Sequence, residues 1–415
     1  MKINFKRLKG LTILLAFFSI LIAFSCKTNK KIVKNTSDKK LSILNLEKLK
    51  SVKKAIKNDS DLYKNSYQSL IKKANNALKE GFFSVTDKTQ IPVSGDKHDY
   101  LSIGPYWWPD PTKKDGLPWI NKDGQVNPIT LGENLDLRRK GKMFRNSHCL
   151  AMAYFITGNE KYAEKAIKLL QVWFLNPETK MNPNLNYAQG IPGRTDGRGI
   201  GIIEFIGIKE VITAIELLEL DHSMNQVTSE GLRSWLKEYL YWLQFSKNGI
   251  DESKMKNNHG TWYDAQLVAL LLFFNKKEEA KTVLQSVKKN RIESQILRTG
   301  ELPLELKRTR PLHYSAYNLE AFTYLAYFGE KLNVDLWNYS PTNAGGIKDA
   351  YRFLYPYVKE EKKWNSKNTV KLENGLEYLK EVFFMAGNMF EIQEYIEVAN
   401  QSTKKDNYNT IRFSF

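Results

Sequence analysis

Helical spacing of apolar residues dominates most of this chain. In four stretches the apolar side chains recur every three or four positions, which places them on one face of an α-helix. These stretches cover residues 63–78, 163–174, 205–218 and 232–243. The pattern therefore predicts an all-α fold in which most helices bury one side.

The predicted helices also alternate between two kinds. "LAMAYFITGNEKYAEKAIKLLQVWF" reads as an apolar helix, a Gly-Asn turn and an amphipathic helix; "AQLVALLLFFNKKEEAKTVLQSVKKNRI" repeats this plan, and "NLEAFTYLAYFGEKLN" begins a third copy. A helix that is apolar all round must be buried, whereas a one-sided helix can cover it from outside. Repeated inner and outer helices close most simply into an (α/α) toroid, an incomplete barrel of helical hairpins around a central cleft. An open helical solenoid is the competing architecture.

Two stretches interrupt the helical pattern. Residues 98–128 are rich in proline, glycine and aromatic residues, and residues 182–201 are rich in glycine, asparagine and arginine. Long loops inside a compact domain are usually either functional or disordered. The density of tryptophan and tyrosine argues against disorder, so we expect these loops to serve the cleft.

The N-terminal region has the features of an export signal. Residues 1–25 begin with positive charges and continue with an apolar run, the order of a secretory signal peptide. The following Cys26, with small residues before it, resembles the lipobox of a bacterial lipoprotein, so we expect Cys26 to be lipidated. We predict a flexible tether over 26–45, a catalytic toroid over 46–400 and a tail over 401–415.

The basic charge narrows the class of partner. The net charge of +18 falls to +14 once the signal, with its four positive charges, is removed. A basic exported protein favours an anionic partner such as an acidic polysaccharide. Nucleic acid is excluded for an exported chain without a recognisable module. We expect membrane contact only through the lipid anchor, on the periplasmic side or the outer-membrane surface, and a monomeric state.

Neither metal nor cofactor is expected. The five histidines show no paired spacing of the kind that binds a metal. Cys149 has no partner once Cys26 is acylated, so no disulfide framework is predicted.

The two loops supply candidate binding residues. Arginines among glycines can approach a carboxylate closely with their planar guanidinium groups, and aromatic faces suit sugar rings. The candidates are Arg194, Arg198, Tyr106, Trp107 and Trp108. Together they favour an acidic polysaccharide, with the alternative that the tryptophans only plug the toroid.

Two further polar clusters stand directly before apolar helices. The first contains Asn257, Asn258 and His259, and the second contains Arg308, Arg310, His313, Tyr314 and Tyr317. If both helices run in the same direction, the two clusters share one rim of the toroid. The simpler alternative is that the asparagines cap a helix and the histidine is structural.

Four motifs resemble the alginate lyase superfamily of α/α-toroid polysaccharide lyases, particularly its broad-specificity members acting on alginate or glucuronan. They are "NNHGTW", "ELKRTRPLHYSAYNLEAF", "YLSIGPYWWPDP" and "WFLNPETKMNPNLNYAQ", within about residues 98–327. The resemblance implies that Asn258, His259, Arg308 and Tyr314 are the functional residues. The stretch RTRPLHY differs in spacing from the classical members, which leaves open whether Arg308 or Arg310 binds the substrate carboxylate.

The chemistry of such a lyase accounts for these residue types. β-Elimination removes the proton at C5 of a uronate and expels the oxygen at C4, so donors such as Asn258 and Arg308 must neutralise the neighbouring carboxylate. In mannuronate and glucuronate the two groups lie on one face, so Tyr314 could serve as both base and acid. In guluronate they lie on opposite faces, and His259 would be needed as base. Tyr314 would need nearby cations to ionise.

The sequence therefore predicts a polysaccharide lyase that cleaves mannuronate-rich alginate, glucuronan or both, and leaves 4,5-unsaturated products. A glycoside hydrolase on the same toroid would need two carboxylates flanking the bond. The available carboxylates are those of Glu204, Asp264, Glu301, Glu305 and Glu320. A lipoprotein that binds acidic glycans without cleaving them is the remaining alternative.

Overall fold

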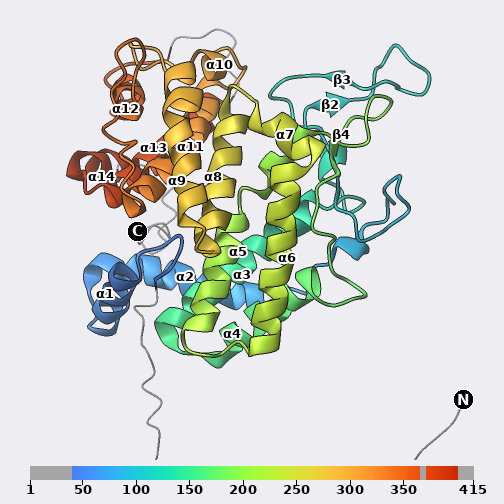
Figure 1. Cartoon of the computed structure of the whole chain (residues 1–415), viewed down its shortest axis with the longest axis horizontal. Helices are drawn as coiled ribbons and strands as arrows, with labels where there is room; N and C mark the ends of the chain where they lie inside the picture. Colours follow the sequence, from blue (N-terminus) through green and yellow to red (C-terminus); the bar gives the residue numbers. More distant parts are fainter. Residues whose placement is uncertain (1–39, 365–370, 401–415) are drawn as a thin grey trace, which may run out of the picture. The chain divides into compact units, whose positions relative to one another are not determined.

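The computed structural model describes residues 40–364 and 371–400, and helices make up most of this part of the chain (Figure 1). Five helices pack one against the next in chain order: α3 (Leu137–Thr157), α5 (Ile208–Leu220), α8 (Asn258–Phe273), α11 (Pro311–Lys331) and α13 (Leu372–Met389). These are the inner helices, and α8 and α11 are buried over most of their length. The predicted all-α toroid is confirmed.

The remaining helices flank the inner ones. They are α1 (Leu46–Lys57), α2 (Asp61–Lys79), α4 (Glu160–Phe174), α6 (Gln226–Phe245), α7 (Lys247–Ser253), α9 (Lys277–Val287), α10 (Pro303–Leu306), α12 (Ile347–Val358) and α14 (Gln393–Ala399). Each outer helix of the predicted hairpins packs on its own inner helix, as α4 does on α3 and α9 does on α8. Among the described residues, no helix is both long and apolar enough to cross a membrane.

The turn between α3 and α4 shows how the sequence ends one helix and starts the next. Gly158 follows α3 with a φ of 73°, a left-handed conformation that glycine adopts without a steric penalty. The side chain of Asn159 then accepts a hydrogen bond of 3.2 Å from the backbone N–H of Lys161 and caps α4. The Gly-Asn pair thus reverses the chain within two residues.

The two long loops contain short strands that join them. Strand β1 (Leu101–Ile103) pairs in parallel with β4 (Tyr187–Gly190), and β2 (Trp107–Trp108) pairs antiparallel with β3 (Ile120–Asn121). The hydrophobic pattern did not predict these strands, because each has only two to four residues. The β1–β4 pair ties residues 98–128 to residues 182–201 at one end of the toroid, and the β2–β3 pair lies within residues 98–128.

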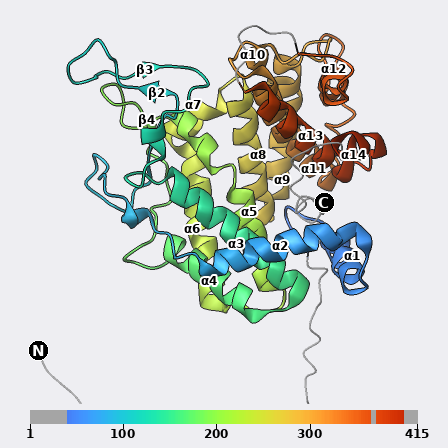
Figure 2. The same cartoon turned by 180° about the vertical axis from the view of Figure 1, so that it is seen from behind.

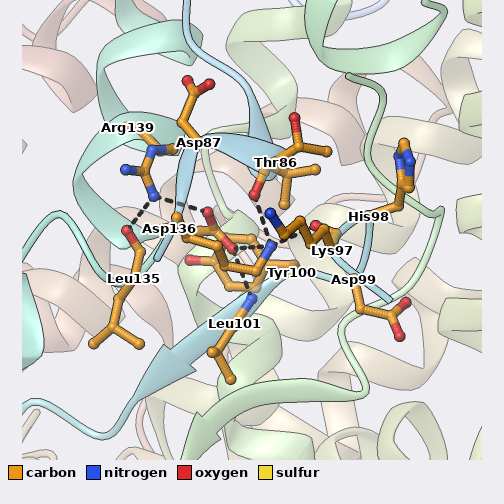
Figure 3. A network of polar contacts seen from close by, with 12 residues as sticks. Thr86, Asp87, Lys97, His98, Asp99, Tyr100, Leu101, Leu135, Asp136 and Arg139 are labelled. Atoms are coloured by element: carbon orange, nitrogen blue, oxygen red, sulfur yellow. Dashed lines mark hydrogen bonds and ion pairs between the residues drawn. The ribbon is translucent and has the colours of Figure 1, made fainter. Parts of the chain in front are cut away.

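A buried ionic network fixes this loop pair to α3 (Figure 3). Asp136, directly before α3, accepts a hydrogen bond of 2.9 Å from the backbone N–H of Leu101 and lies 3.1 Å from Arg139. Lys88 lies 3.2 Å from the same carboxylate, and neither side chain is exposed. Burial raises the pKa of Asp136 to about 6, although the two cations and Leu101 oppose the shift. The network holds β1 against the start of α3.

The folded unit begins at Lys40, six residues before the predicted domain boundary. Leu41, Ile43 and Leu44 are buried, and Ser42 donates to the Glu216 carboxylate from its backbone N–H (2.9 Å) and its hydroxyl (2.5 Å). Residues 40–45 are therefore packed rather than part of the predicted tether. The signal peptide, Cys26, the rest of the tether and residues 401–415 lie outside the described residues.

Candidate active site

The start of α8 and the segment before α11 meet at one end of the toroid. Asn258, the first residue of α8, donates from its backbone N–H and from its side-chain Nδ2 to the two carboxylate oxygens of Glu305, at 2.7 Å each. Glu305 belongs to α10, which precedes α11, and it is buried. In both overall views α7, α10 and strands β2 to β4 gather at this same end (Figures 1 and 2). The two polar clusters therefore share one rim.

His259 is held by a buried carboxylate. Its Nδ1 lies 2.7 Å from Oε1 of Glu252, whose side chain is only 1% exposed. A carboxylate at this position favours the tautomer with the proton on Nδ1, so that Nε2 keeps its lone pair and can accept a proton. The His259 side chain is 16% exposed, so substrate can reach this ring. Glu252 turns a lone histidine into an oriented base.

Tyr314 is placed by one tyrosine and one arginine. Its hydroxyl lies 2.7 Å from the hydroxyl of Tyr106, and the guanidinium carbon of Arg308 lies 3.8 Å from the centre of its ring. Burial raises the pKa of Tyr314, Tyr106 adds to this shift, and Arg308 opposes it. The phenol therefore carries its proton at neutral pH, which suits a proton donor.

The two arginines of the RTR motif have different surroundings. Arg308 forms an ion pair with Asp123, from Nε at 3.1 Å and through a closer contact from its terminal nitrogen. Burial alone would raise the pKa of Asp123, but hydrogen bonds from Arg308 and Thr309 outweigh it and hold the pKa below its ordinary value. Arg310 has no ion pair within the described chain, and its buried Nε has no hydrogen-bond partner there. Arg310 is thus the guanidinium left available to an anion.

The loop arginines lie around one tryptophan. The guanidinium groups of Arg194 and Arg198 lie 5.4 Å and 5.7 Å from the centre of the Trp107 ring. Arg198 is held by Gln189, whose backbone oxygen accepts from Nε at 2.8 Å. Burial lowers the pKa of Arg198 to about 10, so it remains charged at neutral pH.

The aromatic residues of the first loop remain accessible. Tyr106, Trp107 and Trp108 are half-buried, and the indole N–H of Trp108 donates to the Gln125 backbone oxygen at 3.0 Å. Lys122 lies 5.1 Å from the centre of the Trp108 ring. These contacts hold the rings within the loop. They disagree with the alternative interpretation, in which the tryptophans only fill the interior of the toroid.

Asn257 and His313 are the two other residues that were predicted to bind substrate. Asn257 precedes α8, but its side chain forms no capping hydrogen bond and its buried Oδ1 has no hydrogen-bond partner among the described residues. His313 packs among aromatic rings, including those of Tyr317 and Tyr378. Burial and the nearby arginines lower the pKa of His313 to about 4, so its ring is neutral. It supports the site rather than offering a charge.

Three residues that support this site were not among those predicted to form it. Glu252, Glu305 and Asp123 hold His259, Asn258 and Arg308 respectively. Tyr317, which was named in the second polar cluster, packs against Trp262 with ring centres 5.3 Å apart, and burial together with nearby acidic groups raises its pKa. Of the three supporting residues, only Glu252 could have been suspected from the sequence, because it stands seven residues before His259 in a short polar stretch.

The carboxylates that a hydrolase would need have internal partners. Glu204 accepts hydrogen bonds from Tyr100 and Ser102 at 2.7 Å each, and Asp264 pairs with Arg291 at 2.8 Å. Glu305 is bound to Asn258, as described above, while Glu320 accepts from Tyr378. Glu301 accepts from Thr299 at 2.8 Å on the exposed loop before α10. None of these contacts presents two carboxylates across a shared cleft.

Comparisons with known proteins agree with this geometry. The family model described as alginate lyase matches residues 84–364. The crystal structure of an alginate lyase from Bacteroides ovatus superposes with a TM-score of 0.83 at 36% sequence identity, over 90% of this chain and 98% of that chain.

Two more distant structures share the fold. An alginate lyase from Sphingomonas species A1 has a TM-score of 0.51 at 17% identity, over 80% of this chain and 86% of that chain. A variant alginate lyase complexed with a tetrasaccharide has a TM-score of 0.55 at 16% identity, over 85% and 89%. No curated protein matches the chain.

Proposed function

The chain belongs to the alginate lyase family and is a polysaccharide lyase, and we propose that it cleaves mannuronate-rich alginate and glucuronan by β-elimination. The observation that carries this proposal is an oriented histidine and a protonated tyrosine at the starts of two inner helices that share one rim. His259 is held at Nδ1 by Glu252, and Tyr314 lies under Arg308 and against Tyr106. A proton acceptor, a proton donor and the guanidinium of Arg310, which has no ion pair in the described chain, thus gather on one rim.

Binding of the substrate carboxylate is the first task of the site. The C5 proton of a uronate becomes acidic enough to remove only when the neighbouring carboxylate is neutralised. We assign this role to Asn258, which retains one Nδ2 proton beyond the one given to Glu305, and to Arg310, whose guanidinium has no ion pair in the described chain. Arg308 then acts chiefly on Tyr314, because Asp123 occupies much of its donor capacity.

Proton transfer follows from the remaining groups. Loss of the C5 proton to the base forms a carbanion stabilised through the carboxylate, and the C4–O bond then breaks to give the 4,5 double bond. Tyr314 gives its proton to the departing oxygen. Nε2 of His259 is the base where the C5 proton faces it, as a guluronate would require. For mannuronate and glucuronate, Nε2 of His259 takes the proton of the Tyr314 hydroxyl, and the resulting phenolate removes the C5 proton and passes it to the departing C4 oxygen on the same side. The Tyr106 hydroxyl, 2.7 Å from that of Tyr314, donates a hydrogen bond to the phenolate.

The loop residues extend the site along the polymer. The guanidinium groups of Arg194 and Arg198 place two positive charges near the Trp107 ring. Trp108 is the next residue of the same strand, β2. We assign these residues to sugars next to the cleaved bond. Their arrangement suits a charged sugar better than a neutral one, because a neutral sugar offers no partner to the guanidinium groups.

The place of the enzyme in the cell remains a proposal from its N-terminal sequence. We infer that the protein is exported and anchored through lipidated Cys26, on the periplasmic side or the outer-membrane surface, and that it acts as a monomer. Cys26→Ala should release the protein from the membrane fraction. Persistence of Cys26→Ala in that fraction would contradict lipid anchoring.

The test of the activity uses four polymers and two matched variants. Purified protein is mixed with polymannuronate, polyguluronate, glucuronan and a neutral glucan, and the ultraviolet absorbance of unsaturated uronate is followed. We expect a rise with polymannuronate and glucuronan and none with the glucan.

Tyr314→Phe should abolish the rise, because the proton donor is lost. Tyr317→Phe removes a second hydroxyl from the same helix and serves as the matched control. Retained activity in Tyr314→Phe, with loss in Tyr317→Phe, would move the donor role to Tyr317. The absence of any absorbance rise with the wild-type protein would contradict the proposed activity on these polymers.

A further inference from the structure

An exposed row of cations lies on α3, outside the site described above. Arg138, Lys142 and Arg145 occupy positions i, i+4 and i+7, so they lie on one face of the helix, and all three are exposed. Within the described residues, none of them forms an ion pair. Like charges at this spacing destabilise a helix slightly. The row therefore has no evident stabilising role within the fold.

Aromatic rings border this row. The Nζ of Lys142 lies 5.6 Å from the centre of the Phe83 ring, and the Nζ of Lys165, from α4, lies 4.0 Å from that of Phe82. Phe82 is 47% exposed. We call these six residues the α3 basic surface: Arg138, Lys142, Arg145, Lys165, Phe82 and Phe83. The carboxylate of Glu80 adjoins it and accepts a hydrogen bond from Asn146 at 3.3 Å.

The α3 basic surface begins near the loop that enters the active site. Asp136, two residues before Arg138, is bonded to Leu101 through both its backbone and its side chain, at 2.9 Å each. Tyr106 follows Leu101 by five residues, a stretch that spans at most about 17 Å when fully extended. Arg138, the first residue of the row, therefore lies within a few sugar lengths of the Tyr106 hydroxyl, which contacts the hydroxyl of Tyr314. Figure 2 shows α3 on the near side of that view, beside α2.

We propose that the α3 basic surface is a secondary binding site for the uronate polymer. The proposal rests on the proposed function, because it takes the same anionic chain as its ligand. A polymer with one carboxylate on every sugar can pair with several cations at once, while the phenylalanines offer apolar contact to the rings. Binding there raises the effective concentration of the same chain at the cleavage site. It favours long substrates over short ones.

The test separates long from short substrates. Arg138→Gln, Lys142→Gln and Arg145→Gln are combined in one variant, and Lys237→Gln, Lys277→Gln and Lys289→Gln, also exposed, form a control of equal charge change. In dilute buffer we expect the α3 variant to raise the KM for long polymannuronate about tenfold, with kcat unchanged, since each exposed pairing contributes modestly. The KM for short oligomannuronates should not change. Added salt should shrink the difference, because exposed charges are screened within about 10 Å at 0.1 M ionic strength.

The outcomes that overturn the proposal are distinct. An unchanged KM for the long polymer would do so, as would an equal increase in the control variant, which would indicate net charge alone. Reduced binding to anionic phospholipid vesicles with an unchanged polymer KM would assign the surface to membranes instead. If the wild-type protein cleaves no uronate polymer, the proposed function fails. Titration of polymannuronate into the Tyr314→Phe protein, with and without the α3 changes, still tests the surface by the loss of affinity.

Discussion

Replacement of Glu252 by glutamine tests the orientation of the base. Glu252 is 1% exposed and its Oε1 lies 2.7 Å from Nδ1 of His259, so its carboxylate determines which ring nitrogen carries the proton. Glutamine keeps the size of the side chain but can donate as well as accept, so that it also supports the wrong tautomer. Loss of such a supporting contact reduces activity about 10 to 100-fold, and the stronger dependence known for a buried carboxylate–histidine pair reaches about 10⁴-fold.

We therefore expect Glu252→Gln to lower kcat about 100-fold, which corresponds to about 2.7 kcal/mol of transition-state stabilisation. The KM should change little, because Glu252 is buried behind His259 and we assign it no contact with substrate. The assay is the initial rate of unsaturated uronate formation across substrate concentrations, with thermal unfolding measured in parallel. Glu216→Gln changes a half-buried carboxylate in the C-terminal half of α5, which accepts hydrogen bonds from Ser42 rather than from a site residue, and should keep the wild-type kcat.

Two results would refute this reasoning. A folded Glu252→Gln protein with wild-type kcat would show that the carboxylate does not control the tautomer of His259. A change confined to KM would place Glu252 in substrate binding instead of in the orientation of the base.

Three further predictions concern the supports of the site and of the fold. Asp123→Asn should lower kcat about tenfold by releasing Arg308 from its ion pair, and steady-state rates with Asp110→Asn, a partly exposed residue of the same loop, as control would check this; equal rates in both variants would refute it. Asp136→Ala should lower the free energy of unfolding by about 3–5 kcal/mol, because Lys88 and Arg139 lose their buried counter-charge; a urea-unfolding midpoint near that of the wild type would contradict this. Burial raises the pKa of Glu216 to about 7, although Ser42 and Lys331 oppose the shift. The proton is therefore bound more tightly in the folded state, and this contribution to stability is complete below the ordinary glutamate pKa and decreases as the pH rises to about 7. The free energy of unfolding should thus fall by up to about 3 kcal/mol over that range, and this fall should be absent in Glu216→Gln when denaturation is followed at several pH values.

The hydrophobic pattern was sufficient for the helical hairpins because it reports burial directly. The α3–α4 hairpin could be predicted down to its Gly158 and Asn159 turn, since apolar spacing and turn residues are local properties. The same holds for α8, whose apolar surface on all sides indicated an inner helix. The extent of the folded unit was not predictable in this way. Residues 40–45 are held by Glu216 and Lys331, which lie far away in the sequence.

The candidate site, like the fold, could be predicted from the sequence only in part. The motifs that contain His259 and Tyr314 were visible because several unusual residue types stand together in the sequence. The supports of Arg308 and Asn258 were not visible, because each is a single acidic residue of ordinary surroundings: Asp123 meets Arg308 across 185 positions, and Glu305 meets Asn258 across 47. Only the packing of the loops and helices brings these pairs within hydrogen-bonding distance.

Cleavage of polymannuronate in oxygen-18 water tests the central claim most directly. Elimination takes no oxygen from water, whereas hydrolysis adds one water oxygen at every broken bond. We predict product oligosaccharides that carry the unsaturated end and, by mass spectrometry under conditions that prevent exchange at the reducing end, no oxygen-18. Saturated products that carry one oxygen-18 for each cleavage would contradict the account and indicate a hydrolase.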